Sequence, residues 1–229
     1  MLKAWDKLPV WMQIPEVKEY YDILAKRKIS LAFKRGFDFF AAIILLIFLM
    51  PVMCAVAIAI VFDSPGGIFY RQVRVTTYGR RFRIHKFRTM VQNADQLGSQ
   101  VTVGQDNRVT KVGKVLRKYR LDELPQLFDV ISGAMSFVGT RPEVPRYVKK
   151  YTREMRATLL LPAGITSEAS IYYKDEAGTL GAAGENVEEV YIKKVLPGKM
   201  KYNLEGIRKF GFLREIWVMV RTIGAVVRG

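Results

Sequence analysis

The longest uninterrupted apolar run covers residues 41–62, which contain no charged side chain. As a straight helix at about 1.5 Å per residue, this run would extend roughly 33 Å, close to the thickness of the bilayer hydrocarbon. Basic residues crowd both flanks, with eight Lys or Arg in residues 1–35 and seven in residues 71–88. Because a spanning segment normally has its excess of basic residues on one side only, this symmetry favours a segment whose two ends face the same compartment.

Pro51 lies near the middle of the apolar run. It removes a helical hydrogen bond and crowds the preceding turn, so a kink is expected there, with each half reaching about one leaflet deep. We therefore predict a re-entrant membrane helix over residues 34–63, kinked at Pro51, with Lys34, Arg35 and Asp38 at the headgroups. A kinked helix that spans the bilayer is the alternative.

Amphipathic patterns precede and follow this helix. Residues 1–33 combine lysines with Trp5, Trp11, Tyr20 and Tyr21, which predicts an interfacial segment containing a helix from Pro15 toward Ala25. Near the C-terminus, an apolar stripe recurs at helical spacing while arginines repeat on another side. That pattern predicts a basic amphipathic helix, which lies either on the membrane or against the catalytic core. The stripe consists of Leu213, Ile216, Trp217, Val220, Ile223 and Val227, and the arginines are Arg214, Arg221 and Arg228.

Shorter periodic segments predict the rest of the fold. Residues 68–75 and 81–88 read as two strands of a basic β-hairpin, with a bulge where the alternation slips at His85. Helical spacing follows over residues 111–119, and a short strand is expected from Ser136. The polar stretch 91–107 is expected to form a loop. The predicted class is α+β.

The net charge of +16 favours polyanionic partners, namely nucleic acid, acidic lipid headgroups or phosphorylated substrates. Cys54 is the single cysteine and His85 the single histidine, so neither an internal disulfide nor a histidine-based zinc site is expected. The apolar run starts too late for a secretory signal and is expected to be retained.

Asp122 and Glu123 are the strongest candidates for chemistry. They follow a basic stretch, residues 117–120, and precede Pro125, which suits the first position of a short helix closed by Gly133. A carboxylate among cations at a helix start suits phosphate chemistry and can hold a divalent ion. Acids in the first turn also complement a helix dipole without any catalytic role, and for an arbitrary pair that interpretation is the commoner one.

The string from Arg108 to Tyr147 resembles the catalytic core of the bacterial sugar transferases, the monotopic phosphoglycosyl transferases that move a phosphosugar from a nucleotide to a polyprenol phosphate. The resemblance extends to Lys34–Asp38 and Lys86–Met90, and covers roughly residues 34–228. It implies that Asp122 is the nucleophile and that Glu123 holds Mg²⁺. It also implies phosphate contacts from five basic residues, with Arg117 and Arg141 first and Lys86, Arg88 and Arg120 second.

Two of these assignments have a bland alternative. Lys86 and Arg88 fit a solvated cationic face, and Arg141 fits a loop tied to Glu143. The sequence also departs from the family pattern. Met50 replaces the serine of a Ser-Pro pair, residues 161–168 lack an arginine and a tryptophan, and Asn203 stands where an acid is usual. The last two positions belong to the part expected to face the nucleotide sugar, and residues 175–186 form a loop of unassigned role.

We therefore expect three parts: an N-terminal interfacial segment (1–33), a re-entrant helix (34–63) and a catalytic domain (64–229). The expected enzyme transfers a phosphosugar, from a UDP-sugar, to a polyprenol phosphate such as undecaprenyl phosphate, and releases UMP. It would work with Mg²⁺ on the cytoplasmic face of a bacterial inner membrane, in contact with membrane lipids and without nucleic acid, at the first membrane step of glycan biosynthesis. A homodimer is left open. The alternative is a non-enzymatic basic adaptor that binds membranes or nucleic acid.

Overall fold

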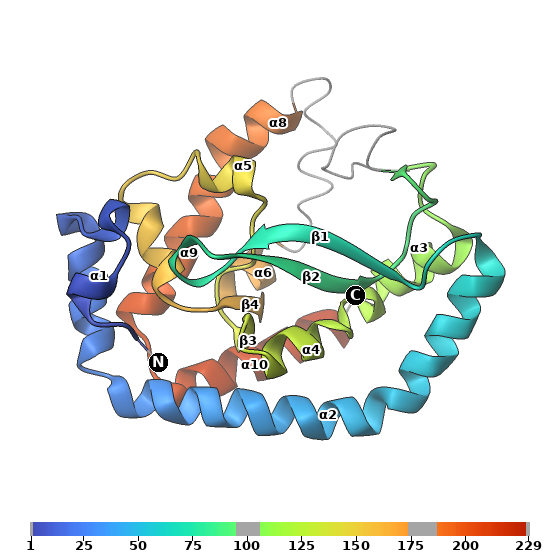
Figure 1. Ribbon diagram of the computed structural model, residues 1–229, viewed down its shortest axis with the longest axis horizontal. Coiled ribbons are helices and arrows are strands. Elements are labelled where there is room, and N and C mark those ends of the chain that lie inside the picture. Colours follow the sequence, from blue (N-terminus) through green and yellow to red (C-terminus); the bar gives the residue numbers. More distant parts are fainter. Residues whose placement is uncertain (1, 95–105, 174–186, 228–229) are drawn as a thin grey trace.

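The computed structural model describes residues 2–94, 106–173 and 187–227, and it mixes helices with two small sheets (Figure 1). Sheet one is the antiparallel pair β1–β2, and sheet two is the parallel pair β3–β4. The α+β class is thus confirmed.

In chain order the elements are η1 (Trp5–Lys7), η2 (Val10–Met12), α1 (Pro15–Ala25), α2 (Lys28–Asp63), β1 (Phe69–Val75), η3 (Thr77–Gly79), β2 (Arg81–Phe87), α3 (Lys111–Lys118), η5 (Leu121–Glu123), α4 (Gln126–Ile131), β3 (Met135–Val138), α5 (Pro145–Val148), η6 (Glu154–Leu160), β4 (Ala163–Thr166), α6 (Glu168–Tyr172), α8 (Val187–Val190), η8 (Tyr191–Val195), α9 (Leu196–Arg208) and α10 (Phe212–Val227).

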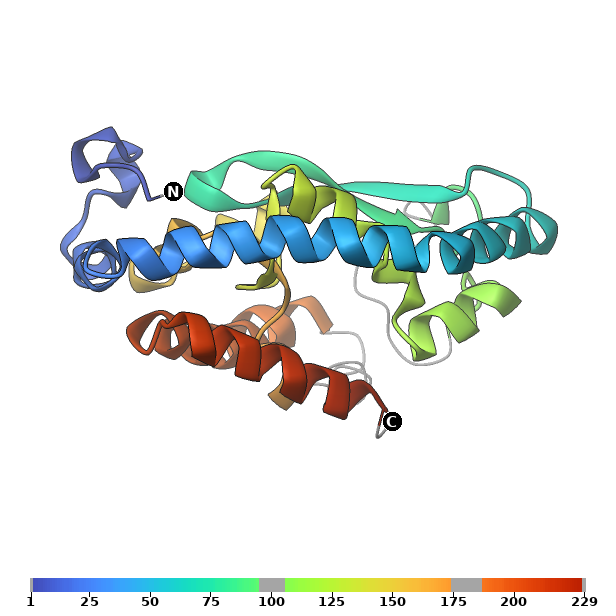
Figure 2. The same cartoon turned by 90° about the horizontal axis from the view of Figure 1, so that it is seen from below.

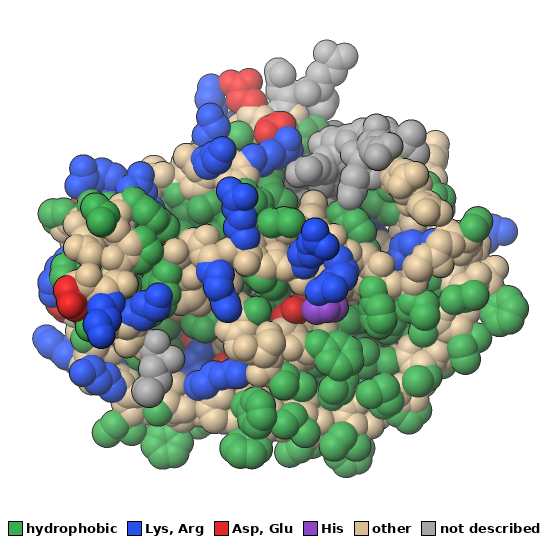
Figure 3. All heavy atoms as spheres, in the orientation of Figure 1, with side chains coloured by type: hydrophobic (Ala, Val, Ile, Leu, Met, Phe, Trp, Pro, Cys, Tyr) green, Lys and Arg blue, Asp and Glu red, His purple; other side chains and the backbone are tan. Residues whose placement is uncertain are grey.

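Helix α2 forms one long edge of the molecule and starts at Lys28, ahead of the expected start at Lys34. It is the single described helix that is long and apolar enough to cross a membrane, and its apolar window is only 11% buried. Figure 1 shows it running along the bottom of the molecule and then turning upward toward β1, and Pro51 lies inside it. Apolar side chains cover that lower edge in Figure 3, whereas basic side chains gather above it.

Helix α2 is attached to the rest of the fold along its length. Near its start, Asp38 accepts hydrogen bonds from the Ser136 hydroxyl (2.7 Å) and the Phe137 amide (3.3 Å) of β3. Ala42 packs in a core cluster with α4 and β3, and Ile60 packs near the other end with Phe87 and Leu116. Lys34 and Asp38 are buried and paired inside the protein, so the expectation that they anchor at lipid headgroups is wrong.

The β1–β2 hairpin has an unbroken antiparallel register from Phe69↔Phe87 to Val75↔Arg81. The strands and turn were predicted, but the expected bulge at His85 is absent from this register. Lys86 lies on the same face as Ile84, as alternation requires, and that face meets the candidate site. The apparent slip in the sequence arises because a polar functional side chain occupies an inward position.

Strand β4 pairs in parallel with β3 and was not predicted from the sequence. Two glycines allow the strands to approach, because a Cβ at Gly164 would overlap the backbone of Gly139. Gly139 donates its amide to Thr166 (2.9 Å), and Gly164 donates its amide to Thr140 (2.9 Å). This small sheet positions the loop that carries Arg141.

The N-terminal segment packs into the largest core cluster, with η6 and α9 as its neighbours. Helix α1 spans Pro15–Ala25 as predicted. Tyr20, however, is fully buried and donates its hydroxyl to Glu154 (2.5 Å). Its assignment as an interfacial anchor is therefore wrong, whereas Trp11 stays 40% exposed.

Helix α10 lies beside α2 on the same face of the molecule (Figure 2). The ring of Phe212 contacts those of Phe33 and Phe37 near the start of both helices. Of the predicted apolar stripe, Leu213, Trp217, Val220 and Ile223 are exposed, and α10 instead buries Val218 against the core. The exposed stripe favours the membrane-surface interpretation of this helix.

Candidate functional site

The carboxylate pair lies in η5, between α3 and α4. Thr110 caps the start of α3 by accepting the Gly113 amide (3.0 Å), and the helix ends at Lys118. Arg120 then adopts a left-handed conformation (φ 53°), which redirects the chain into η5. Asp122 and Glu123 are both buried there, immediately ahead of α4.

Glu123 is the centre of a cationic cluster. Arg141 Nη2 lies 2.5 Å from Glu123 Oε1, and Lys86 Nζ lies 3.1 Å from the same oxygen. Arg120 Nη1 approaches Glu123 Oε2 at 3.9 Å. Lys86 and Arg141, which lie 37 and 18 residues away in sequence, thus converge with the neighbouring Arg120 on one carboxylate, and the guanidinium of Arg141 is bound within the site.

The two acids have opposite electrostatic environments. For Asp122, burial is the main cause that raises its pKa above the ordinary aspartate range, although Lys86 Nζ at 3.7 Å opposes it. For Glu123, burial also raises the pKa, but the charges of Arg141 and Lys86 together outweigh burial and hold the pKa below the ordinary range. Glu123 is therefore the firmly ionised member of the pair, and Asp122 is the more basic carboxylate.

Helix α4, which supports the pair, is held at its C-terminal end. Arg35 of α2 donates to the carbonyls of Val130 (2.7 Å) and Ile131 (2.8 Å) in the last turn, and Val130 also accepts the amide of Gly133 (3.0 Å). The chain then turns at Gly133, whose φ of +77° favours glycine. This arrangement ties α4, and the carboxylates that precede it, to α2.

His85 belongs to the support of the site. Its Nδ1 lies 2.8 Å from Asp129 Oδ1 of α4, and its backbone amide donates to Asp129 Oδ2 (2.9 Å). The buried Asp129 thus holds β2 against α4. Among the described residues, His85 forms no hydrogen bond with Asp122 or Glu123.

Two of the predicted phosphate ligands point elsewhere. Arg88 donates to the carbonyls of Ser64 (2.6 Å) and Pro65 at the end of α2. Arg117 donates its Nε to the Thr89 hydroxyl (2.9 Å), although its charge still acts on Asp122. The structure thus brings Lys86, Arg120 and Arg141 onto the carboxylates, with Arg117 nearby and Arg88 at the C-terminal end of α2.

Thr89 was not singled out from the sequence, and it positions Arg117. Its place within the Lys86–Met90 motif was the available indication.

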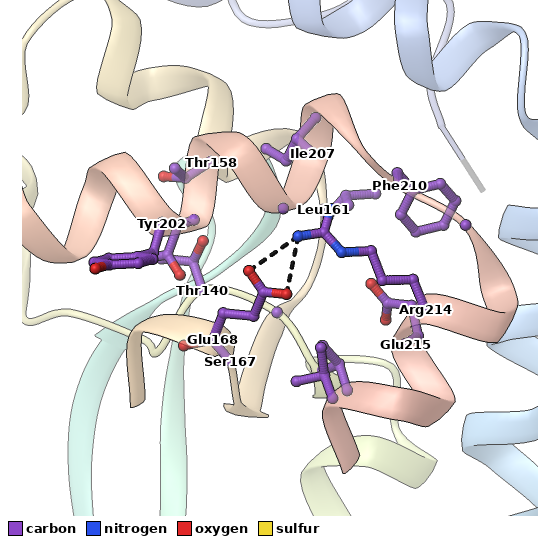
Figure 4. Close-up of a pocket in the computed structure, with 16 residues that line it drawn as sticks. Thr140, Thr158, Leu161, Ser167, Glu168, Tyr202, Ile207, Phe210, Arg214 and Glu215 are labelled. Carbon is purple, nitrogen blue, oxygen red and sulfur yellow. Dashed lines mark hydrogen bonds and ion pairs between the residues drawn. The ribbon is translucent and has the colours of Figure 1, made fainter. Parts of the chain in front are cut away.

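Residues from two of the departures from the family pattern, the segment 161–168 and Asn203, line a separate cavity of about 50 Å³ (Figure 4). Glu168 Oε1 and Oε2 each accept a hydrogen bond from Arg214 Nη2 (2.9 Å), which ties α6 to α10. Asn203 and Ser167 line the same cavity, whose described lining includes neither Asp122 nor Glu123. Of these three residues, Glu168 is the one that braces the C-terminal helix.

Within residues 2–94, 106–173 and 187–227, no group of three or more His, Cys, Asp or Glu side chains is arranged to hold a metal by itself. A divalent ion at Glu123 would need oxygens from a substrate. Residues 175–186 and most of the 91–107 loop lie outside the described residues.

Comparison with known proteins identifies the family. Residues 29–229 match the family model described as bacterial sugar transferase. The chain is 36% identical over 199 residues to a UDP-N-acetylgalactosamine-undecaprenyl-phosphate N-acetylgalactosaminephosphotransferase of Aeromonas hydrophila (86% of this chain, 44% of that protein). It is 34% identical to a UDP-glucose:undecaprenyl-phosphate glucose-1-phosphate transferase of Escherichia coli (83% and 39%).

The chain thus spans less than half the length of these two relatives. A shorter relative, the exopolysaccharide production protein ExoY of Sinorhizobium fredii, is 32% identical with 84% of each chain covered. Both the arrangement of the site and the extent of the match lead to one assignment. The chain belongs to the bacterial sugar transferase family.

Proposed function

We propose that the chain is a phosphoglycosyl transferase that moves a phosphosugar from a UDP-sugar to a polyprenol phosphate such as undecaprenyl phosphate. The observation that carries this proposal is the buried Asp122 carboxylate, of raised pKa, beside Glu123 and beneath basic side chains that outnumber the two acids. Such a site attracts phosphate oxygens and supplies a carboxylate nucleophile. The names of the relatives supply the substrate classes.

In the proposed first step, an oxygen of Asp122 attacks the sugar-linked phosphorus of the UDP-sugar. The bond from that phosphorus to the bridging oxygen breaks, and UMP leaves with this oxygen. In the second step, an oxygen of the lipid phosphate attacks the same phosphorus, and the bond to Asp122 breaks. The product is a lipid diphosphate sugar, and the carboxylate is regenerated.

Neither step requires net proton transfer when the acceptor phosphate is a dianion, because each step exchanges one oxyanion for another. The site agrees with this requirement. The single histidine of the chain is paired with Asp129 rather than with either acid of the site, so no general base need be sought there. Lys86 and Arg141 would instead stabilise charge on the phosphates.

Magnesium fits Glu123 as a ligand shared with substrate. Mg²⁺ is commonly held by one or two carboxylates together with substrate phosphates, which is the donor set that Glu123, its neighbour Asp122 and a diphosphate provide. When bound, the ion would neutralise charge on the diphosphate. Lys86 and Arg141 already contact Glu123 Oε1. We therefore expect the ion to bind together with the nucleotide sugar rather than before it.

The decisive experiment incubates the purified protein with Mg²⁺, undecaprenyl phosphate and a panel of UDP-sugars, and measures UMP release. UMP formation that requires one of the UDP-sugars supports the proposal. Absence of release with every donor, together with salt-sensitive binding of nucleic acid, would favour the non-enzymatic adaptor.

Glu123→Gln is expected to weaken the response of UMP release to Mg²⁺ and to lower the stability of the fold. The stabilisation from the low pKa of Glu123 is fully present above its unfolded pKa, and it is lost as pH falls through the folded pKa. At neutral pH we expect a loss of about 1–3 kcal/mol, because Arg141 and Lys86 lose the negative charge of Glu123. Thermal unfolding in detergent measures it, with the exposed Glu189→Gln as control. An unchanged Mg²⁺ titration would place the ion elsewhere.

The pH dependence of the first step should report Asp122. Its attack requires the ionised carboxylate, and burial raises its pKa. The single-turnover rate of UMP release without acceptor should therefore rise with pH through a value above the ordinary aspartate pKa of about 3.9. Omitting the acceptor removes the titration of the lipid phosphate, whose second pKa is about 6 in phosphate esters. A rate that rises with pH through a value at or below the ordinary aspartate pKa would contradict the assignment of Asp122 as the nucleophile.

We further propose that α2 is re-entrant and holds the catalytic domain on the cytoplasmic face of the inner membrane. Support comes from its attachments, because Asp38 near its start and Asp63 at its end both bind the catalytic domain. Asp63 Oδ2 accepts the Val112 amide at the start of α3 (3.0 Å). A helix held to one domain at both ends cannot cross a bilayer unless that domain enters the bilayer too.

Cysteine labelling tests this topology. In a Cys54→Ala background, Lys3→Cys and Arg71→Cys are both exposed positions on either side of α2. We expect a membrane-impermeant maleimide to label both from the cytoplasmic side of inverted vesicles. Labelling of the two positions from opposite sides would establish a spanning helix.

A further inference from the structure

A second cavity, of about 490 Å³, lies between the membrane helix and the C-terminal helix. We call it the α2–α10 groove. Its volume is within the usual range for ligand pockets. One wall comes from α2 and the other from α10, and α4, β4 and α6 contribute further residues. The lining is mostly apolar and includes Phe37, Ala41, Leu45, Leu49, Leu124, Leu127, Phe137, Ile165, Ile171, Met219, Thr222, Ile223 and Ala225.

The groove has a charged end. Lys118, Arg120 and Glu123 also line it, so the cavity adjoins the proposed active site through Glu123. Lys118 has no carboxylate partner within the described chain, and Arg120 reaches Glu123 only at 3.9 Å with its side chain 41% exposed. Two cations at one end of an apolar channel suit a ligand with an anionic head and a hydrocarbon chain.

Both walls are helices that expose apolar side chains outside the groove as well. On α2, Phe40, Ile44 and Phe48 are exposed, and on α10 Trp217 and Val220 are exposed. Figure 2 shows the two helices side by side on the same face of the molecule. A lipid chain could therefore enter the groove from the bilayer that these surfaces would contact, without passing through water.

We propose that the α2–α10 groove binds the first part of the prenyl chain of the acceptor lipid and that Lys118 and Arg120 receive its phosphate. This assignment rests on the proposed transferase function and adds the site at which the acceptor is held. The nucleotide sugar would bind on the side of the acid pair occupied by Lys86 of β2, which contacts both carboxylates. The two substrates would thus approach the acid pair from different sides.

The test compares two alanines on the same helix. Ala41→Phe fills the groove, and Ala55→Phe places the same apolar ring on an exposed part of α2 outside the groove lining. Ala41→Phe should raise the KM for undecaprenyl phosphate on the order of tenfold or more, because small volume changes in apolar pockets have effects of this size. Ala55→Phe should not change it. Neither substitution removes apolar surface, so membrane binding is preserved.

A second pair guards against misfolding. Ile223 lines the groove and Val220 does not, and both side chains are largely exposed on α10. Ile223→Ala should raise the acceptor KM several-fold, and Val220→Ala should leave it unchanged. Because the groove receives the proximal chain, the Ile223→Ala and Ala41→Phe effects should persist with farnesyl phosphate, whose short chain tests proximal contacts.

The outcomes separate this proposal from the function on which it rests. Absence of UMP release by the wild-type protein, with or without acceptor, would remove the transferase function. UMP release in a single turnover together with an unchanged acceptor KM in both groove variants would overturn the groove alone, and would assign it to the acyl chain of a bilayer phospholipid. An effect on undecaprenyl phosphate but not on farnesyl phosphate would also overturn it, since partitioning rather than proximal binding would then be responsible.

Discussion

Asp122→Asn is expected to reduce UMP release by on the order of a thousandfold or more and to leave no sugar-phosphate adduct on the protein. The amide is a poor nucleophile, and the neighbouring carboxylate, Glu123, is occupied by Arg141 and Lys86. Single-turnover UMP release and intact-protein mass spectrometry without acceptor measure both effects. A variant that retains a tenth of the wild-type rate would exclude Asp122 as the nucleophile.

The same substitution should stabilise the fold, which a purely structural acid would not do. Burial raises the folded-state pKa of Asp122, so ionisation of this group destabilises the fold. The stabilisation of the folded state by the protonated Asp122 carboxyl is fully present below the unfolded pKa. It is lost as pH rises through the folded pKa. At neutral pH the uncharged amide of the variant should therefore make the folded state more stable than the wild-type carboxylate does.

Thermal unfolding in detergent at neutral pH checks this sign. The Asp122→Asn variant should melt at a higher temperature than the wild type, whereas Glu123→Gln should melt lower. Asp22→Asn is a suitable control, because Asp22 and Lys18 form an exposed pair on α1 and such pairs contribute little. A lower melting temperature for Asp122→Asn would mean that its contact with Lys86 outweighs the cost of burial.

The local part of the site could be predicted from the sequence, and its long-range part could not. The turn at Arg120, the acid pair and the short helix after Pro125 depend on neighbours in the chain. Lys86 and Arg141 reach Glu123 from 37 and 18 residues away, and only the family resemblance pointed to them. Resemblance alone did not show that Arg88 binds the end of α2.

The fold shows the same division. Helix α1 and the β1–β2 hairpin follow local periodicity and were predicted nearly to the residue. Strand β4 is four residues long and pairs with a strand 28 positions earlier, so no local pattern reveals it. Tyr20 was misassigned because an amphipathic helix has the same periodicity whether its apolar face meets lipid or a protein core.

Lys34→Ala is expected to lower the free energy of unfolding by about 3–5 kcal/mol, the usual cost of removing one partner from a buried ion pair. Lys34 Nζ donates to the carbonyl of Val138 (2.8 Å) and to Glu215, and it lies 4.0 Å from Asp38. All three charged side chains are at most 14% exposed. Without the ammonium group, the carboxylates of Asp38 and Glu215 remain buried and lose the cation between them.

This cluster joins α2, β3 and α10. Loss of Lys34 should therefore loosen α10 as well as destabilise the fold, and hydrogen exchange over α10 should rise before global unfolding. Lys193→Ala provides the matched control, because Lys193 and Glu189 form an exposed pair and its removal should cost at most about 0.5 kcal/mol. Equal losses in the two variants would show that the Lys34 cluster is solvated, and that Lys34 contributes little to the attachment of α2 to β3 and α10.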